Sequence, residues 1–254
     1  MGIRSLTTLI KQKSPGSIET KALYSLSGKR VAIDTSIFLY KSLSNYRNNG
    51  DYLRNKDNKI VSHIIGIFYK TIQYLSLGIT PIYIFDGKPP IEKKTVLDGR
   101  AKKAEENKIL AGKSTTEEEA LKYERNAIRV KKHHITDIKH LFDLMGVSYI
   151  HPDGEAEAYA SELCRIGYVD YVVTEDMDTL VYGCPKMIRN CLDKSIKRKD
   201  VVSVINLDIL LKDFEMDMKE FIDLCVLCGC DYCPSIPKVG PVKSFNYIKT
   251  HKTI

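Results

Sequence analysis

The segment DYVVTEDMDTLVYG, from Asp170 to Gly183, joins a short apolar run to a crowded group of carboxylates. Residues 171–173 are β-branched or aromatic, which favours a buried strand. Three acids, Glu175, Asp176 and Asp178, follow at once. Like charges this close raise one another's pKa and lower stability unless something positive lies among them. The residues alone allow a metal site, a solvated loop or an aspartate nucleophile.

Two other segments repeat this pattern of an apolar run that ends in aspartate: KRVAID (29–34) and TPIYIFD (80–86). A stretch of helical period, residues 62–78, lies between the first two strands of the set. Strands that alternate with helices predict an α/β fold, with a mostly parallel central sheet and helices on both faces. Ligands of such sheets bind at the carboxyl ends of the strands. We therefore expect Asp34, Asp86 and Asp176 to converge on one crevice.

A long charged insertion separates the second and third strands. Residues 93–134 are dense in Lys, Arg and Glu and hold few large apolar side chains. They predict helices that bury little surface, either as a solvated hairpin or as a mobile lid that a charged ligand orders.

Glu155 and Glu157 open the next predicted helix, where the helix dipole alone would favour acids. Residues two apart on a helix point about 200° apart. Both could serve one metal cluster only if one acts from further away or the first turn is irregular.

The C-terminal part predicts two helices joined by a turn-rich hairpin that contains Gly229 and Gly240. Such a hairpin can present backbone N–H groups to a phosphate. Its four cysteines form two C-x-x-C pairs only one residue apart, with the first pair in an apolar helical run. Small buried cysteines are therefore favoured over a zinc site; the four are Cys225, Cys228, Cys230 and Cys233.

Composition points to a basic protein that stays off membranes. Of the 254 residues, 39 are Lys or Arg and 32 are Asp or Glu, a net charge of +7. No apolar run approaches the roughly 20 residues that span a bilayer, and the N-terminus lacks signal-peptide features. We expect an intracellular protein with reduced cysteines and a basic surface suited to a polyanion.

The ordered motifs together resemble the flap endonuclease family of 5′ structure-specific nucleases, which is related to exonuclease one and the excision-repair 3′-incision endonuclease. The motifs are MGI (1–3), VAIDTSIFLY (31–40), SHIIGIFYKTI (62–72), YIFDGKPP (83–90), GEAEAYAS (154–161), VTEDMDTLVYG (173–183) and CGCDYCPSIPKVGP (228–241). The resemblance implies nuclease regions at 1–107 and 140–216, a helical arch at about 88–134, and a helix–hairpin–helix DNA-binding region at 217–254.

The resemblance also implies a two-metal phosphodiesterase with two Mg²⁺ ions, for which Mn²⁺ can substitute, and a K⁺ ion at the hairpin. The implied metal ligands are Asp34, Asp86, Glu155, Glu157, Asp176, Asp178 and Asp231. The implied catalytic residues are Lys93, Arg100, Asp34, Asp86, Glu155 and Asp178. The implied DNA-binding residues are Gly2, Tyr40, Arg47, Lys93, Arg100, Glu155, Asp231, Gly240 and Lys243. Glu175 is not among the family's ligands.

The implied substrate is branched or 5′-ended DNA, which the family cuts near single-strand/double-strand junctions during replication and repair. The protein is expected to be a monomer and to act in the nucleus or at another site of DNA replication. Two departures from the family pattern bear on this. Residues 54–59 (RNKDNK) are basic where the family is acidic, and Lys238 replaces the first glycine of the hairpin. The first departure favours simple flaps, gaps or ends over double flaps. No sliding-clamp motif occurs, so clamp binding is not expected.

Three alternatives stay open. A junction binder that does not cut would have a damaged acidic cluster. An aspartyl phosphatase would use Asp176 and Asp178 as a D-x-D-x-T-like loop and would hydrolyse small phosphomonoesters. Within the nuclease class, a 5′–3′ exonuclease or a repair endonuclease that acts on bubbles is the main competitor.

Overall fold

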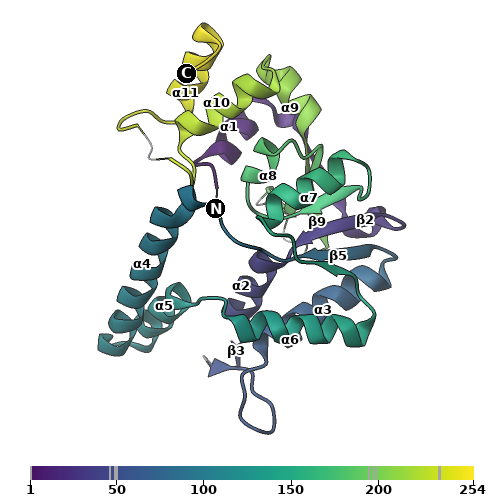
Figure 1. Ribbon diagram of the computed structural model, residues 1–254, viewed down its shortest axis with the longest axis vertical. Coiled ribbons are helices and arrows are strands. Elements are labelled where there is room, and N and C mark those ends of the chain that lie inside the picture. Colours follow the sequence, from purple (N-terminus) through teal and green to yellow (C-terminus); the bar gives the residue numbers. More distant parts are fainter. Residues whose placement is uncertain are drawn as a thin grey trace.

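The computed structural model describes residues 2–45, 47–48, 51–193, 195–196, 198, 200–233 and 236–254, with the side chains of 45, 47–48 and 51–52 also outside the described part. Within these ranges the main sheet has seven strands in the order β1-β9-β8-β7-β2-β5-β6 (Figure 1). Its strands are β1 (Ile18–Ala22), β2 (Arg30–Asp34), β5 (Thr80–Ile84), β6 (Tyr149–Ile150), β7 (Tyr171–Val173), β8 (Lys186–Asn190) and β9 (Val201–Asn206). A separate pair is formed by β3 (Arg47–Asn48) and β4 (Asp51–Tyr52).

The centre of the main sheet is parallel. β2 pairs in parallel with β5 on one side and with β7 on the other, and β6 and β8 extend the parallel set. β9 and β1 add an antiparallel edge. After β2, the chain adds β5 and β6 on one side of β2 and then β7, β8 and β9 on the other side. The direction in which strands are added therefore reverses between β2 and β7. A crevice for ligands is expected at such a switch point.

Helices cover both faces of the sheet, as the alternation of apolar strand residues requires. Ala32 packs in the cluster beneath α7, α9 and α10, whereas Val31 and Ile33 pack in the cluster beneath α3 and α6. The helices are α1 (Leu6–Lys13), α2 (Thr35–Asn45), α3 (Ser62–Ser76), α4 (Lys94–Lys113), α5 (Glu117–Ala127), α6 (Lys132–Met145), α7 (Ala156–Arg165), α8 (Asp178–Val181), α9 (Leu207–Phe214), α10 (Met218–Cys228) and α11 (Pro241–His251), with 3₁₀ turns η1 (Pro15–Ser17), η2 (Leu23–Leu26) and η3 (Ile91–Lys93). The predicted fold class is confirmed.

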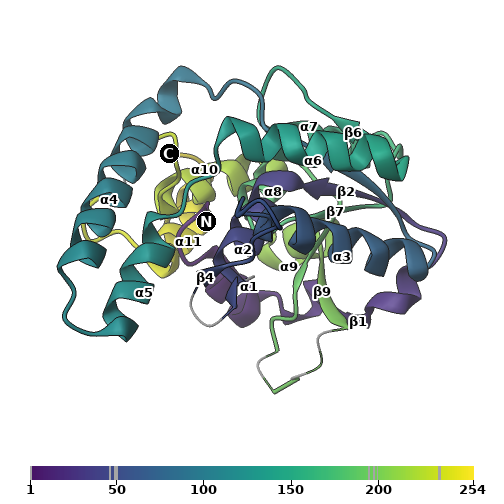
Figure 2. The same cartoon turned by 90° about the horizontal axis from the view of Figure 1, so that it is seen from below.

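The charged insertion forms a helical hairpin that projects beside the sheet. α4 and α5 pack against each other and stand off to one side of the sheet, as Figure 2 shows from below. Thr116 caps α5 by accepting a hydrogen bond from the Glu119 backbone N–H at 3.3 Å. α5 buries none of its residues, and α4 buries only Ala104 and Asn107. The hairpin is therefore held mainly at its two ends.

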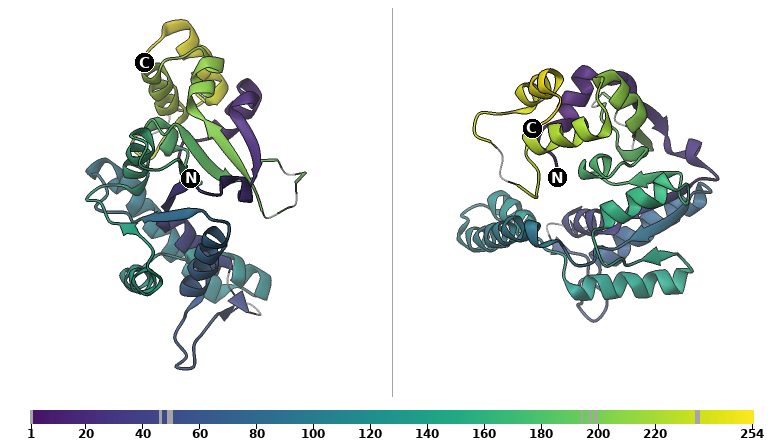
Figure 3. Two further views of the ribbon diagram at one scale, coloured as in Figure 1. Left: turned by 90° about the vertical axis from the view of Figure 1, so that its right-hand side faces the viewer. Right: turned by 45° about the horizontal axis from the view of Figure 1, so that its top comes forward.

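The C-terminal hairpin lies at the end of the molecule away from α3 and α6 (Figure 3). α10 begins with a capping box in which Asp217 and Glu220 exchange hydrogen bonds with each other's backbone N–H groups. It ends at Gly229, which has a φ of +95°, and α11 begins with Pro241 at its first position. No helix in the described ranges has both the length and the apolar composition needed to cross a membrane.

Candidate active site

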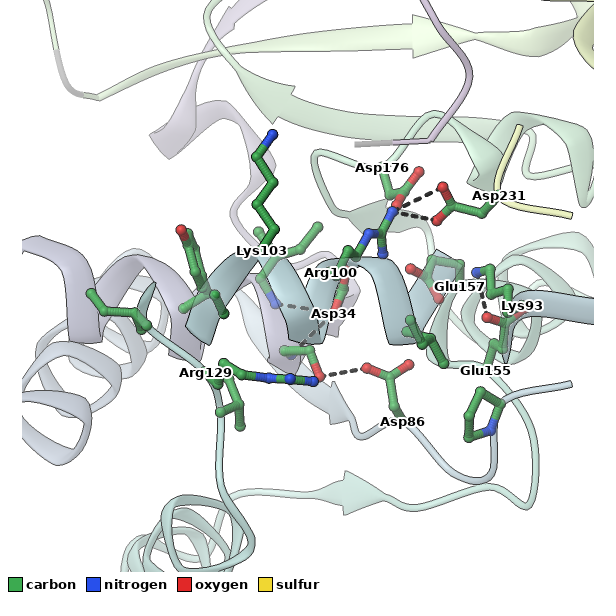
Figure 4. A pocket seen from close by; sticks show the side chains of 18 of the residues that line it. Asp34, Asp86, Lys93, Arg100, Lys103, Arg129, Glu155, Glu157, Asp176 and Asp231 are labelled. Carbon is green, nitrogen blue, oxygen red and sulfur yellow. Dashed lines mark hydrogen bonds and ion pairs between the residues drawn. The ribbon is translucent and has the colours of Figure 1, made fainter. Parts of the chain in front are cut away.

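Acids from the ends of three parallel strands line one pocket of about 670 Å³ (Figure 4). Asp34 ends β2, and Asp86 and Asp176 follow β5 and β7. One carboxylate oxygen of Asp34 accepts backbone N–H groups at the start of α2, and the other accepts the Thr174 hydroxyl at 2.9 Å. Asp86 accepts the Ala156 N–H at 3.1 Å, at the start of α7. These bonds tie the ends of β2 and β7 and the start of α7 around the pocket.

The two glutamates of the GEAEA motif reach the same pocket despite their spacing. Glu155 precedes α7 as its N-cap, in an extended conformation with φ −74° and ψ +143°, whereas Glu157 lies within the first turn. The angle of about 200° expected between helical neighbours therefore does not apply to this pair. Figure 4 shows both side chains on the same side of the pocket. The irregular first turn was one of the two conditions that the sequence left open.

Asp176 lies on the short loop between β7 and α8, Asp178 is the first residue of α8, and both lie against Gly2 near the beginning of the chain. The Asp178 backbone N–H donates to Asp176 at 3.1 Å, yet among the described residues neither buried carboxylate oxygen of Asp178 has a hydrogen-bond partner. Gly2 has a φ of +74°, and a Cβ there would overlap carboxylate oxygens of both residues. Only glycine suits this position, for its backbone and for the close approach. Gly2 therefore belongs beside the acidic cluster.

Burial and mutual repulsion keep these carboxyl groups from ionising normally. Burial raises the pKa of Asp34 to about 7, with the charge of Asp86 adding to it. Burial and the neighbouring Asp176 raise the pKa of Asp178 to about 7. Burial and the charge of Asp34 raise the pKa of Glu157 to about 9. The cluster is poised to accept positive charge.

These raised pKa values predict that the metal-free protein loses stability as pH rises. An acid whose pKa is higher folded than unfolded stabilises the fold below the unfolded pKa of about 4, and this contribution is lost as pH rises through the folded value. The free energy of unfolding in EDTA should therefore fall between about pH 4 and pH 9. Urea unfolding at a series of pH values measures it.

Asp178→Asn is the matched variant for this prediction, because it removes one raised pKa and keeps the shape of the side chain. We expect it to be more stable than the parent at pH 8 in EDTA, and the parent to regain stability when Mg²⁺ is added. A parent whose stability rises steadily from pH 4 to pH 8 in EDTA would contradict the raised pKa values.

Lys93 reaches the cluster from the base of the arch. It is buried, its ammonium pairs with Glu155, and it lies 4.8 Å from the ring centre of Tyr232. Burial opposes its charge, but the hydrogen bond and charge of Glu155 outweigh burial and raise the pKa of Lys93. Glu155 also accepts hydrogen bonds from the hydroxyls of Tyr182 and Tyr232. Nothing in the spacing of these tyrosines singled them out, although each lies in a motif that carries a predicted ligand.

Arg100 crosses from α4 to the loop between α10 and α11. Its guanidinium donates to both oxygens of Asp231, at 2.8 and 2.6 Å, as the dashed lines in Figure 4 show. Tyr40 of α2 lines the pocket with 39 % of its surface exposed, and its hydroxyl lies 3.4 Å from the Arg125 carbonyl oxygen. Lys103 and Arg129 line the same pocket. Neither residue stands out in the sequence, because a single cation within a basic segment carries no individual signal.

The remaining predicted DNA-binding residues lie away from the pocket or outside the description. Gly240 precedes α11 with φ −114° and ψ +178°, a conformation open to any residue, and a Cβ there would meet nothing. Lys243 is exposed on the first turn of α11. Lys238, which stands where the family has glycine, has a φ of +64°. The side chain of Arg47 lies outside the described part.

Glu175 is explained by an ion-pair network. Its carboxylate pairs with Lys41 of α2 at 3.1 Å and Arg189 of β8 at 3.1 Å, and it accepts the Asn190 N–H at 3.0 Å. Burial opposes its ionisation, but the charge of Lys41, the Asn190 N–H and the charge of Arg189 lower its pKa. Glu175 thus anchors the strand end next to Asp176.

Glu175→Gln should destabilise the protein by about 1–3 kcal/mol, because it leaves Arg189 half-buried without its partner. Urea unfolding at pH 7 measures this change. Glu162→Gln is the control, since it breaks an exposed pair with Arg165 that solvent screens and that should contribute little to stability. Equal effects of the two variants would show that the Glu175 network contributes no more than a surface pair.

The donor set of the pocket suits a hard divalent cation, which prefers carboxylate oxygens. Asp178 does not line the pocket itself, but its buried carboxylate lies beside Asp176 and has no hydrogen-bond partner in the described part of the chain, which supports this fit. Within the described ranges, however, no three acidic, histidine or cysteine side chains are close enough together to hold a metal ion. Instead Lys93 and Arg100 pair with Glu155 and Asp231. The described arrangement is therefore one in which the protein's own cations balance part of the negative charge.

Comparisons with known proteins give a consistent result. Residues 1–107 match the model of the XPG N-terminal domain, and residues 146–231 match that of the XPG I-region. Flap endonuclease 1 of Candida glabrata is 39 % identical over 255 residues, and that of Pyricularia oryzae is 39 % identical over 259. The whole chain is covered in both, against 67 % and 65 % of the relatives. The chain thus spans about two thirds of the length of these curated relatives.

Solved structures of the same class share the fold. The catalytic core of Rad2 in complex with DNA substrate superposes with a TM-score of 0.76 at 28 % identity, covering 100 % of this chain and 70 % of that one. Flap endonuclease-1 from Methanococcus jannaschii superposes with a TM-score of 0.70 at 30 % identity, covering 92 % and 74 %. The chain belongs to the flap endonuclease family of structure-specific nucleases.

Proposed function

We propose that this chain is a Mg²⁺-dependent 5′ structure-specific nuclease that cuts DNA phosphodiesters at the junction of single and double strands. The observation that carries the proposal is one pocket. In it, acids from three strand ends and from the start of α7 face Lys93 and Arg100, which lie at the base of the arch formed by α4 and α5. A phosphodiester in this pocket would lie between the acidic side chains and the basic side chains that its hydrolysis requires. Family membership supports the same reaction.

The acidic residues are proposed to hold two divalent cations, and Mn²⁺ should replace Mg²⁺ because both accept oxygen ligands. The proposed ligands are Asp34, Asp86, Glu155, Glu157, Asp176, Asp178 and Asp231. When bound, such a pair of cations activates water and stabilises the leaving oxygen of an in-line displacement.

Lys93 and Arg100 are proposed to exchange partners when DNA arrives. In the free protein they pair with Glu155 and Asp231. A scissile phosphate presents two anionic oxygens that Lys93 and Arg100 can share, and Arg100 can contact it through two donors. When Lys93 and Arg100 move to the phosphate, Glu155 and Asp231 are free to face the divalent metal ions. The two basic side chains then place positive charge where the transition state gains negative charge.

DNA binding is proposed to extend from the pocket along two surfaces. The arch would admit the single strand, with Tyr40 stacking on a base at the pocket rim and with Gly2 and Arg47 near the junction. The C-terminal hairpin between α10 and α11 would hold duplex DNA through Gly240, Lys243 and a K⁺ ion. Recognition rests on phosphates and shape, so the protein discriminates DNA structures and not base sequences.

Lys243→Ala should weaken duplex binding about equally for all sequences and reduce the slope of log K against log salt by about one. Fluorescence anisotropy of labelled duplex across a salt series measures both values. Lys219→Ala, which removes an exposed lysine of the neighbouring helix α10, should leave the slope unchanged. An unaltered slope in Lys243→Ala would remove the hairpin contact from the proposal.

The substrate class is tested with a panel of 5′-labelled DNAs in Mg²⁺: a single flap, a double flap, a gap, a bubble and a blunt end. We expect junction-proximal cutting that EDTA abolishes, with the single flap, gap or end preferred over the double flap because residues 54–59 are basic. Tight binding without cutting would favour the junction binder. Hydrolysis of p-nitrophenyl phosphate without DNA cleavage would favour the phosphatase. The proposed place of action is the site of DNA replication and repair.

A further inference from the structure

Two thiols face each other in the loop between α10 and α11. The Sγ atoms of Cys230 and Cys233 are 3.5 Å apart, and both residues are half-buried, so that solvent can reach them. Cys225 and Cys228, which complete the two C-x-x-C pairs, are buried in α10. Among the described residues no three cysteine, histidine or acidic side chains lie close enough together to hold a metal ion. The facing pair is left as a dithiol with no assigned role.

The two residues between these thiols both contact the pocket. Asp231 accepts hydrogen bonds at both of its carboxylate oxygens from one guanidinium nitrogen of Arg100. Tyr232 donates to Glu155, and its ring lies 4.8 Å from the Lys93 ammonium. The loop conformation that sets the separation of the thiols therefore also sets the positions of Asp231 and Tyr232. We therefore expect a covalent bond between the thiols to shift Asp231 and Tyr232.

We propose that Cys230 and Cys233 form a peroxide-sensitive dithiol whose oxidation reversibly switches off cleavage. One thiolate attacks hydrogen peroxide, the O–O bond breaks, and a sulfenic acid and water form. The second thiolate attacks the sulfenic sulfur, the S–O bond breaks, and a disulfide and a second water form. The cysteines lose two electrons and two protons, and the peroxide is reduced to two water molecules. A dithiol reductant reverses the change by thiol–disulfide exchange.

The expected effect follows from the distances. A disulfide holds its sulfur atoms about 2.05 Å apart, so the thiols must approach each other by about 1.5 Å from the 3.5 Å of the reduced pair. Catalytic groups tolerate displacements of only about 0.5 Å. Closing the ring should therefore displace Asp231 and Tyr232 and slow cleavage at least about 10-fold. The effect on cleavage rests on the proposed function, whereas formation of the disulfide does not.

The test treats the full chain with hydrogen peroxide and follows two readouts. Peptide mass mapping reports whether Cys230 and Cys233 are joined, and cleavage of a 5′-labelled single flap in Mg²⁺ reports activity. We expect a 230–233 disulfide, a fall in cleavage rate of at least about 10-fold, and recovery after dithiothreitol. If the untreated protein does not cut, the proposed function has failed, and the mass map alone then decides whether the dithiol oxidises.

Cys230→Ser and Cys233→Ser are two independent variants that cannot form the disulfide and should keep their cleavage rate under peroxide. Cys191→Ser is the matched control, because Cys191 is also half-buried but lies in another loop, and this variant should be inhibited like the parent. The inference is overturned if the 230–233 disulfide does not form, if it forms without slowing cleavage, or if both serine variants are inhibited as strongly as the parent.

Discussion

Asp178→Asn should reduce the cleavage rate at saturating DNA by at least about 10³-fold, because it removes one negative charge from the acidic cluster beside the pocket and leaves the shape of the side chain unchanged. Both oxygens of Asp178 are buried without a hydrogen-bond partner, so their negative charge has no structural use in the described arrangement. A buried carboxylate that lowers stability and has no hydrogen-bond partner among the described residues is best explained by a ligand that it binds. Single-turnover cleavage of a labelled flap in Mg²⁺ measures the effect.

Asp170→Asn is the control from the same segment. Asp170 lies at the opposite end of β7, where it pairs with Lys29 at 3.2 Å and accepts the Arg30 N–H at 2.9 Å. It should cleave like the parent. DNA affinity, measured in Ca²⁺ to suppress cutting, should stay within about threefold of the parent in both variants. Cleavage by Asp178→Asn within tenfold of the parent would remove this residue from the catalytic group.

Lys93→Ala should lower the maximal cleavage rate by about 10²–10³-fold, since removing one positive group aimed at transition-state charge typically has an effect of this size. The side chain is held in a single direction by burial, by Glu155 and by the ring of Tyr232. Because the phosphate gains charge only in the transition state, the rate at saturating DNA should fall while the apparent Kd for DNA changes little.

Lys94→Ala gives a matched comparison one residue along the chain. Lys94 carries the same charge at the start of α4 but is exposed, so its loss should affect DNA binding slightly and the maximal rate less than about threefold. If the two alanine variants lower the maximal rate equally, the effect of Lys93 comes from the general basic charge of the arch and not from its position in the pocket.

Much of the fold was predictable because its signals are local. Each central strand is a short β-branched or aromatic run that ends in aspartate, and parallel pairing brings those ends to one edge. The arch was recognisable from its lack of apolar residues, and α5 indeed buries none of its side chains. Fold class and the common position of Asp34, Asp86 and Asp176 therefore followed from composition and periodicity.

The rest depended on contacts between segments distant in the sequence. The pairing of Arg100 with Asp231 joins residues 131 positions apart, and the contacts of Tyr182 and Tyr232 with Glu155 depend on the packing of two loops. Glu155 was difficult to interpret for a local reason: its spacing from Glu157 suggests one helix, but the N-cap backbone is extended. Glu175 carried no signal that separated it from its acidic neighbours, and only its partners Lys41 and Arg189 reveal its role.

The most direct test is the Mg²⁺ dependence of single-turnover cleavage of a 5′-labelled single flap, with the parent and Asp178→Asn measured side by side. If two divalent cations act together in this pocket, the parent's rate should rise with about the second power of Mg²⁺ concentration at low Mg²⁺ and vanish in EDTA. Asp178→Asn should stay at least about 10³-fold slower at every concentration. Cleavage that persists in EDTA, or that Asp178→Asn performs at the parent's rate, would contradict a metal-dependent acidic site.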